Sequence, residues 1–290
     1  MTDKEQKISN TFEESALKIE RLTFFEGVAM IVGANIGAGI LSLAFGARKA
    51  GWPVLVFFLI VAGVFTTVSM LYVAETTLRT RKPMQLSGLA EKYVGQLGSW
   101  LMFASVAVNS LGCLIAYTNG SGQILSGFLG VTPAVGSLIF FVPAVVVIWM
   151  GLRVTGVSEK VITAGMGIMI LILIIATIAG PGIKTEHLKF TNWYYAVPVF
   201  SLAIFCYISQ YLVPELTRGY SAEGGDIQNL PRSIMAGMFI TGVLLAVVPM
   251  AALGMQGPES VSQVVTLAWG EALGQWAFFT ANAFALCAMI

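Results

Sequence analysis

Charged side chains are scarce in this 290-residue sequence. Asp, Glu, Lys and Arg together make up 11% of the residues, whereas they make up roughly a quarter of a typical soluble domain. A chain so poor in charge is not an ordinary water-soluble domain. The net charge of +1 carries no information about a partner, and no nucleic-acid partner is expected.

Histidine and cysteine are also rare. The only histidine is His187, which is expected in a solvated loop, and the three cysteines are Cys113, Cys206 and Cys287. The cysteines lie in apolar segments without the paired spacing of a metal or redox motif, so we expect small buried residues. A membrane-embedded enzyme needs a metal cluster or an acid–base pair. Because the sequence offers neither a histidine pair nor a mid-span carboxylate pair, we expect no enzyme.

Apolar residues, by contrast, make up 57% of the sequence, and the mean hydropathy is +0.82. A helix of about 20 apolar residues crosses the hydrocarbon of a bilayer, and the few charges divide the chain into windows of about that size. The sequence therefore predicts an all-α integral membrane protein with the lipid bilayer as its surroundings. The predicted spans are 23–47, 51–78, 99–125, 133–152, 158–179, 194–216, 231–255 and 275–290.

The ends of the chain are predicted to differ in character. Residues 1–22 are polar and predict a cytoplasmic tail, and residues 23–290 predict one transmembrane domain. The last apolar run is too short for a span and has no polar flank, so we expect a chain truncated in helix 8. Residues 82–98 predict a short helix on the membrane surface.

Basic residues lie mostly on one side of the predicted topology. With the N-terminus in the cytoplasm, every Lys and Arg except Arg48, Lys49, Lys184 and Lys189 falls in a cytoplasmic segment or tail. Cytoplasmic segments of membrane proteins carry such an excess. The sequence predicts a multi-pass protein of the cytoplasmic (plasma) membrane with its N-terminus inside.

Two of the predicted spans are irregular. The first contains MIVGANIGAGILSLAF at Met30–Phe45, with three glycines and a single Asn35. The sixth contains FCYISQYLVPEL at Phe205–Leu216, in which polar residues interrupt the apolar run and Pro214 is predicted to end it. Polar groups at membrane depth usually face a cavity or a partner.

The positions of these irregularities allow two interpretations. An odd number of spans separates the first from the sixth, so the second copy would be inverted. Discontinuous helices at corresponding positions of two halves are typical of inverted-repeat transporters, which hold their substrate where the helices unwind. Alternatively, the glycines of the first span allow close helix packing. The spacing alone leaves both interpretations open.

Three segments resemble one known family. The stretch GANIGAGILSL at Gly33–Leu43 resembles the first-helix signature of amino acid permeases of the amino acid, polyamine and organocation superfamily. The nearest branches are the aromatic and hydroxy amino acid permeases and the amino acid/auxin permeases. AYTNGSGQIL at Ala116–Leu125 and the PEL-ended stretch Phe205–Leu216 are similar to the third- and sixth-helix patterns. Ala44 stands where those families commonly carry proline, which bears on the substrate subtype.

The resemblance implies a fold of five helices plus five inverted helices, with helices 1 and 6 discontinuous. It implies a symporter that imports an amino acid, aromatic in the nearest branch, by alternating access. The coupling ion would be a proton or sodium, and no other cofactor is expected. Among the alternatives, a channel or an uncoupled facilitator ranks ahead of a membrane-embedded enzyme.

A broken helix offers both partners that an amino acid zwitterion needs. The free N–H groups at Ala38 and Gly39 suit the carboxylate, and freed carbonyls and a hydroxyl suit the ammonium. The candidate substrate-binding residues are Asn35, Ala38, Gly39, Tyr117, Phe205, Cys206, Tyr207 and Ser209. Tyr117 is the candidate for closing the carboxylate end, with an ordinary packing role as its alternative.

Two further groups of candidates concern the cation and the gate. By similarity to the family, the carbonyls of Gly33 and Ile36 would form half of a cation site; no other metal is expected. Glu26, Glu75 and Glu215 lie near cytoplasmic ends of spans and are gate candidates. They would pair with Arg21, Arg79 or Arg218, unless each carboxylate simply extends to the interface.

Overall fold

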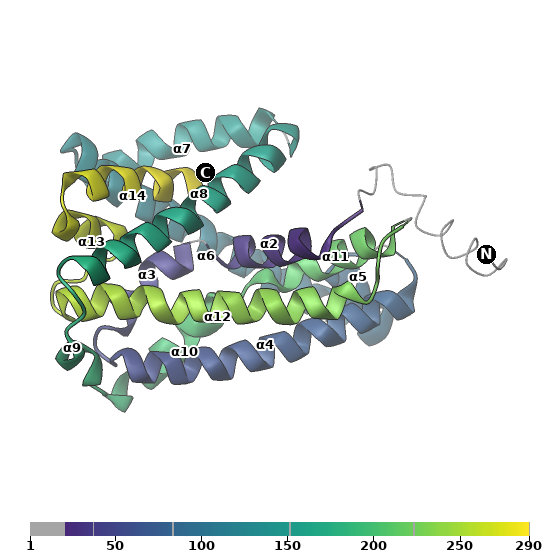
Figure 1. Cartoon of the computed structure of the whole chain (residues 1–290). Helices are drawn as coiled ribbons and strands as arrows, with labels where there is room; N and C mark the ends of the chain where they lie inside the picture. The colour runs from purple at the N-terminus through teal and green to yellow at the C-terminus, as the bar shows by residue number, and fades with distance from the viewer. Residues whose placement is uncertain (1–20, 37, 83, 151, 223, 290) are drawn as a thin grey trace. The chain divides into compact units, whose positions relative to one another are not determined.

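The computed structural model describes residues 21–36, 38–82, 84–150, 152–222 and 224–289, which are helical over most of their length and include no strand. Figure 1 shows the helices along the chain. In order they are α2 (Phe24–Asn35), α3 (Ala38–Ala47), α4 (Trp52–Thr80), α5 (Leu86–Val94), α6 (Gln96–Leu129), α7 (Pro133–Met150), α8 (Leu152–Ala179), α9 (Thr185–Lys189), the 3-10 helix η1 (Trp193–Tyr195), α10 (Ala196–Phe205), the 3-10 helix η2 (Ser209–Leu212), α11 (Val213–Ser221), α12 (Asn229–Gln256), α13 (Val265–Leu273) and α14 (Gln275–Ala288).

Membrane-length helices are present where the sequence predicts them. Among the described residues, α4, α6, the stretch Trp193–Ser221 and α12 are long and apolar enough to cross a bilayer, and α2 with α3 makes a fifth span if counted together. Shorter apolar stretches lie in α7 and α8. Large apolar side chains such as Phe65 and Ile175 are exposed, as expected for a surface in contact with lipid. The prediction of a helical membrane protein is confirmed.

The chain divides into two compact units. Unit 1 contains the described residues of 21–35, 61–110 and 207–241, and unit 2 those of 36–60, 111–206 and 242–289. Two of the boundaries, after Asn35 and after Cys206, fall at the irregular points of predicted spans one and six. The long helices α4, α6 and α12 have residues in both units.

In unit 1, the start of α2 packs against the end of α11. Thr23 and Glu26 form a capping box: Glu26 Oε2 accepts from the Thr23 amide at 2.9 Å, and the Glu26 amide donates to Thr23 Oγ1 at 3.4 Å. The Tyr220 hydroxyl donates to the Thr23 carbonyl at 3.2 Å. A side chain at Gly27 would collide with the Tyr220 ring, so glycine is what allows this close approach.

In unit 2, helix α13 is held by buried hydrogen bonds. Trp269 is fully buried, and its Nε1 donates to Thr177 Oγ1 on α8 at 2.7 Å. Thr266 Oγ1 donates to Asn282 Oδ1 on α14 at 2.8 Å. Figure 1 shows α13 and α14 side by side within this unit.

Two local details add to what the sequence indicates. Pro214, predicted to end the apolar run of the sixth span, lies in the first turn of α11, where the amide that proline lacks would have no helical partner and where its φ suits a helix. His187 was expected to be solvated, but it is half buried, and its Nδ1 lies 3.1 Å from the Gly254 carbonyl. That carbonyl belongs to the last turn of α12, which leaves it without an intrahelical donor.

Candidate functional site

The first predicted span is interrupted between two helices. Helix α2 ends at Asn35 and α3 begins at Ala38. Ile36 is buried and non-helical between them, and Gly37 lies outside the described residues. Gly33 is in the last turn of α2, so its carbonyl and that of Asn35 are among the four that an α-helix leaves without an intrahelical donor. The cation-site candidates Gly33 and Ile36 therefore lie on either side of the end of α2.

The sixth predicted span is interrupted as well. Helix α10 ends at Phe205, and the chain continues through Cys206, Tyr207 and Ile208 before η2 begins at Ser209. In an uninterrupted α-helix the Ser209 amide would donate to the Phe205 carbonyl. Here it donates to the side chain of Asn35, with a distance of 3.1 Å between Ser209 N and Asn35 Oδ1.

Within unit 1, Asn35 and Ser209 are joined by a second hydrogen bond. Asn35 Nδ2 donates to Ser209 Oγ at 3.1 Å. The Asn35 side chain therefore forms hydrogen bonds with both the main-chain amide and the hydroxyl of Ser209. Both residues are buried, with relative exposures of 2% and 0%. Asn35 thus caps the 3-10 helix that continues the sixth span.

Thr241 and two methionines complete this buried polar cluster. Asn35 Nδ2 also lies 3.4 Å from Thr241 Oγ1 on α12. The sulfur of Met238 lies 3.7 Å from Asn35 Nδ2, and that of Met70 lies 3.7 Å from Ser209 Oγ. Sequence reasoning missed all three residues. Thr241 carried a usable signal, because it is a hydroxyl within a long apolar span, whereas methionine in such a span carries none.

Within unit 2, Gly39 contacts Cys206. A Cβ on Gly39 would lie 2.9 Å from Cys206 Sγ and 3.4 Å from its Cα, so the first turn of α3 lies directly against the end of α10. The first four amides of α3 and the last four carbonyls of α10 have no partner within their own helix. The amino end of one helix dipole therefore adjoins the carboxyl end of another, and Phe205 and Ala38 are the neighbouring positions along the chain.

The remaining substrate candidates are placed as follows. Tyr207 belongs to unit 1, is 4% exposed and has its hydroxyl 3.0 Å from where a Cβ on Gly63 would be. Tyr117 is half buried on α6 and belongs to unit 2 with Gly39 and Cys206. The structure thus brings together Asn35 with Ser209, and Gly39 with Cys206.

The three gate candidates make local contacts. Glu75 pairs with Arg79 at 2.5 Å and Glu215 with Arg218 at 3.5 Å, each within one helix. Glu26 accepts hydrogen bonds from Thr23 at the start of its own helix. The exposed pair between Glu75 and Arg79 contributes little to stability. A gating role for these carboxylates stays a prediction.

Ligands for a transition metal are not clustered. Among the described residues, no group of three or more His, Cys, Asp and Glu side chains is placed to hold a metal ion. The polar groups at the two interruptions are main-chain amides and carbonyls, hydroxyls and one carboxamide. Oxygen ligands of this kind suit a hard cation, and the amides suit an anion.

A chain with several apolar helices of membrane length, two spans of which are interrupted near buried polar groups, is an integral membrane protein of the permease type. Its sequence belongs to the tryptophan/tyrosine permease family, whose family model matches residues 20–270. None of the curated protein sequences is significantly similar to it. The resemblance to amino acid permeases is therefore confirmed at the level of the family.

Proposed function

We propose that this protein is a secondary active transporter that imports an aromatic amino acid across the plasma membrane, with a proton or sodium gradient as the driving force. The observation that carries the proposal is the pairing of two interrupted helices at their interruptions. Asn35 and Ser209 are hydrogen-bonded within unit 1, and Gly39 lies against Cys206 within unit 2. Family membership supports amino acid transport.

The ends of α3 and α10 in unit 2 match a zwitterion. The amides of Ala38 and Gly39 would bind the substrate carboxylate, because the amino end of a helix carries partial positive charge. The carbonyls of Phe205 and Cys206 would accept from its ammonium group at the carboxyl end of α10. This arrangement satisfies both charges without burying a charged side chain. Tyr117, also in unit 2, is the proposed hydrogen-bond donor to the carboxylate.

The polar cluster of unit 1 contains further residues with proposed ligand contacts. The side chain of Asn35 already forms hydrogen bonds with Ser209. The proposed ligand contact of Asn35 is therefore its main-chain carbonyl. The Ser209 hydroxyl and the Tyr207 carbonyl remain proposed contacts of the ammonium group. The carbonyls of Gly33 and Ile36 are the proposed partial site for a coupling cation.

Alternating access follows from the same interruptions. In transporters with discontinuous helices, one repeat or bundle moves against the other around a binding site that the interruptions hold. We propose an arrangement of five helices plus five inverted helices, with the N-terminus in the cytoplasm. Glu26, Glu75 and Glu215 are the proposed residues near the inner gate.

Uptake by proteoliposomes tests this function. The protein is reconstituted and the entry of labelled tryptophan or tyrosine is followed with an inward sodium gradient, an inward proton gradient or neither. We expect saturable uptake that one of the gradients stimulates, with each substrate competing against the other and lysine competing poorly. Uptake that responds to neither gradient would indicate an uncoupled facilitator, and unitary conductance in a planar bilayer would indicate a channel.

A further inference from the structure

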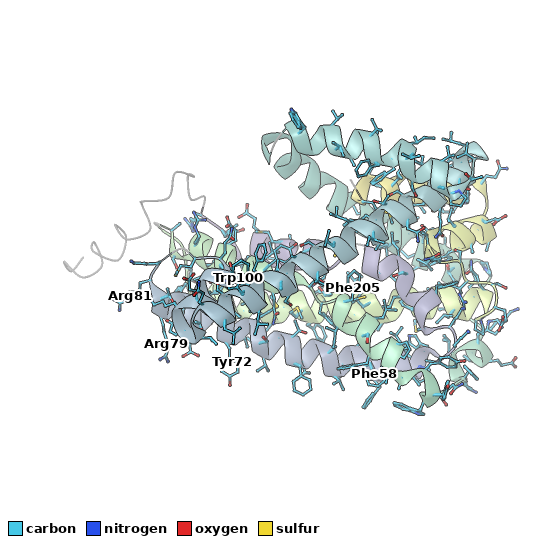
Figure 2. All side chains as sticks on the ribbon, turned by 180° about the vertical axis from the view of Figure 1, so that it is seen from behind. Phe58, Tyr72, Arg79, Arg81, Trp100 and Phe205 are labelled. Atoms are coloured by element: carbon cyan, nitrogen blue, oxygen red, sulfur yellow. The ribbon has the colours of Figure 1, made fainter. Side chains whose placement is uncertain are left out.

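Four exposed basic side chains gather where α4 meets α5 in unit 1. Arg79 is in the last turn of α4, Arg81 and Lys82 follow its end, and Lys92 is in the last turn of α5. Figure 2 shows Tyr72, Arg79 and Arg81 in succession toward this end of α4. These four basic residues are referred to here as the basic corner.

Arg81 has an unusual backbone conformation. Its φ is 55°, and it is the only non-glycine residue with a positive φ in the part of the chain that the structure describes. Its amide donates to the Thr77 carbonyl at 3.3 Å and so closes the last turn of α4. This left-handed position after a helix is ordinarily filled by glycine, which adopts it without strain. An arginine in this conformation costs free energy, which makes its side chain a candidate for a role of its own.

Helix α5 is fastened beside the basic corner. The hydroxyls of Thr80 and Tyr93 lie 2.9 Å apart, and Lys92 Nζ lies 5.5 Å from the centroid of the Tyr93 ring. Leu89, one turn earlier in α5, is 5% exposed. Lys92 therefore lies next to an aromatic ring, and the buried Leu89 anchors the helix that carries both.

The surroundings of the corner are those of a membrane interface. Tyr72, Tyr93 and Trp100 are 67%, 53% and 64% exposed, and aromatic residues of this kind gather at headgroup level. Val94 and Leu97 add exposed apolar surface. The apolar side chains would therefore contact the acyl chains of a lipid, and the aromatic side chains would contact its headgroup region.

The charge balance of the corner is positive. Glu75 pairs with Arg79 at 2.5 Å, and Glu91 is an exposed carboxylate on α5. Arg81, Lys82 and Lys92 therefore outnumber the remaining carboxylate. A phosphodiester with an uncharged polar tail is complementary to this set, whereas a zwitterionic headgroup would bring its own cation close to three others.

We propose that the basic corner binds the headgroup of an anionic phospholipid such as phosphatidylglycerol, with Arg81 as the principal phosphate ligand. This site lies apart from the proposed substrate site and would make the stability of the protein depend on the lipid composition of the bilayer. Juxtamembrane Lys and Arg attract anionic lipids over a short range. The exposed aromatic side chains would contact the lipid at headgroup level.

Two substitutions at Arg81 separate the role of its charge from the strain of its backbone. Arg81→Asn removes the charge and places a residue that tolerates the left-handed conformation, and Arg81→Lys keeps the charge. Each purified protein is unfolded by heat in detergent with added phosphatidylglycerol, phosphatidylcholine or soluble glycerol phosphate. Lys184→Gln, which removes an exposed charge from unit 2, is the matched control.

Without lipid, we expect Arg81→Asn to raise the melting midpoint by about 2–4 °C, because strain is relieved. With phosphatidylglycerol, we expect its affinity for the lipid to be about fivefold lower than that of the unaltered protein. Arg81→Lys and Lys184→Gln should keep the lipid response. An unchanged response in Arg81→Asn, an equal loss in Lys184→Gln, or an equal response to soluble glycerol phosphate would overturn the proposal. Because substrate uptake is measured separately, failure here leaves the proposed transport function standing.

Discussion

Asn35 and Ser209 exchange two hydrogen bonds across a separation of 174 residues, each with a length of 3.1 Å. One uses the carbonyl oxygen of the Asn35 side chain and the other its NH₂ group. The carboxamide thereby replaces the helical bond that the Ser209 amide would otherwise make. One interrupted span is thus held to the other by a side chain.

Substitution of Asn35 tests this cap. Asn35→Ala would leave the buried amide and hydroxyl of Ser209 without this partner, and we expect a loss of about 1–3 kcal/mol in the free energy of unfolding. Ser209→Ala is the matched control, because it keeps the main-chain hydrogen bond and removes only the hydroxyl. Thermal unfolding followed by tryptophan fluorescence measures both. A larger loss in Ser209→Ala than in Asn35→Ala would show that the hydroxyl, not the cap, carries the interaction.

Gly39 and Cys206 form a pair that distinguishes packing from ligand binding. The Cβ of Gly39→Ala would lie 2.9 Å from Cys206 Sγ, so we expect lower stability and lower uptake. Adding Cys206→Ala removes that sulfur while leaving the main-chain carbonyl in place. We expect the double variant to regain stability but not uptake, since the methyl group would still stand between the substrate and the first turn of α3. Thermal unfolding and proteoliposome uptake are the two measurements.

Recovery of uptake together with stability in the double variant would favour the other interpretation of the glycines, namely close helix packing alone. The single variant Cys206→Ala serves as the reference for both measurements. Its uptake should stay near that of the unaltered protein, because the proposed contact of Cys206 is its carbonyl and not its thiol.

Gly27 allows the start of α2 to approach Tyr220. A Cβ on Gly27 would lie 2.9 Å from Tyr220 Cζ and nearer still to the hydroxyl, so Gly27→Ala should destabilise the protein by about 1–3 kcal/mol. Gly112→Ala is the control: this glycine lies in α6 with no atom within 4 Å of a built Cβ. There alanine should be neutral or stabilising by up to about 1 kcal/mol. Equal melting midpoints for the two variants would contradict the contact.

The hydrogen bond between Trp269 and Thr177 anchors α13 on α8. Trp269→Phe removes the Nε1 donor, and Thr177→Val removes the hydroxyl that accepts from it. Because both side chains are buried, each change should cost about 1–3 kcal/mol of unfolding free energy. The double variant should cost less than the sum, since the two changes remove one shared interaction. Strictly additive losses would mean that the two groups do not depend on each other.

Much of this molecule follows from local sequence. The membrane helices were predictable because apolar run length is a property of one segment, and α5 was predictable from the short helical pattern of residues 82–98. The two interruptions were also visible, through the glycines near Asn35 and the polar residues after Phe205. Resemblance then indicated amino acid permeases, and the match to the tryptophan/tyrosine permease family confirms it.

Contacts between segments that are distant in the sequence could not be predicted from local sequence patterns. The sequence alone determined where the spans are and where two of them break, because hydropathy and glycine content act locally. Only the tertiary structure decided that Asn35 turns its carboxamide to Ser209, that Gly39 faces Cys206, and that Pro214 lies in the first turn of α11. The physical reason is that a hydrogen bond or a close approach depends on the rotation and depth of both helices, which each segment acquires only by packing against the other.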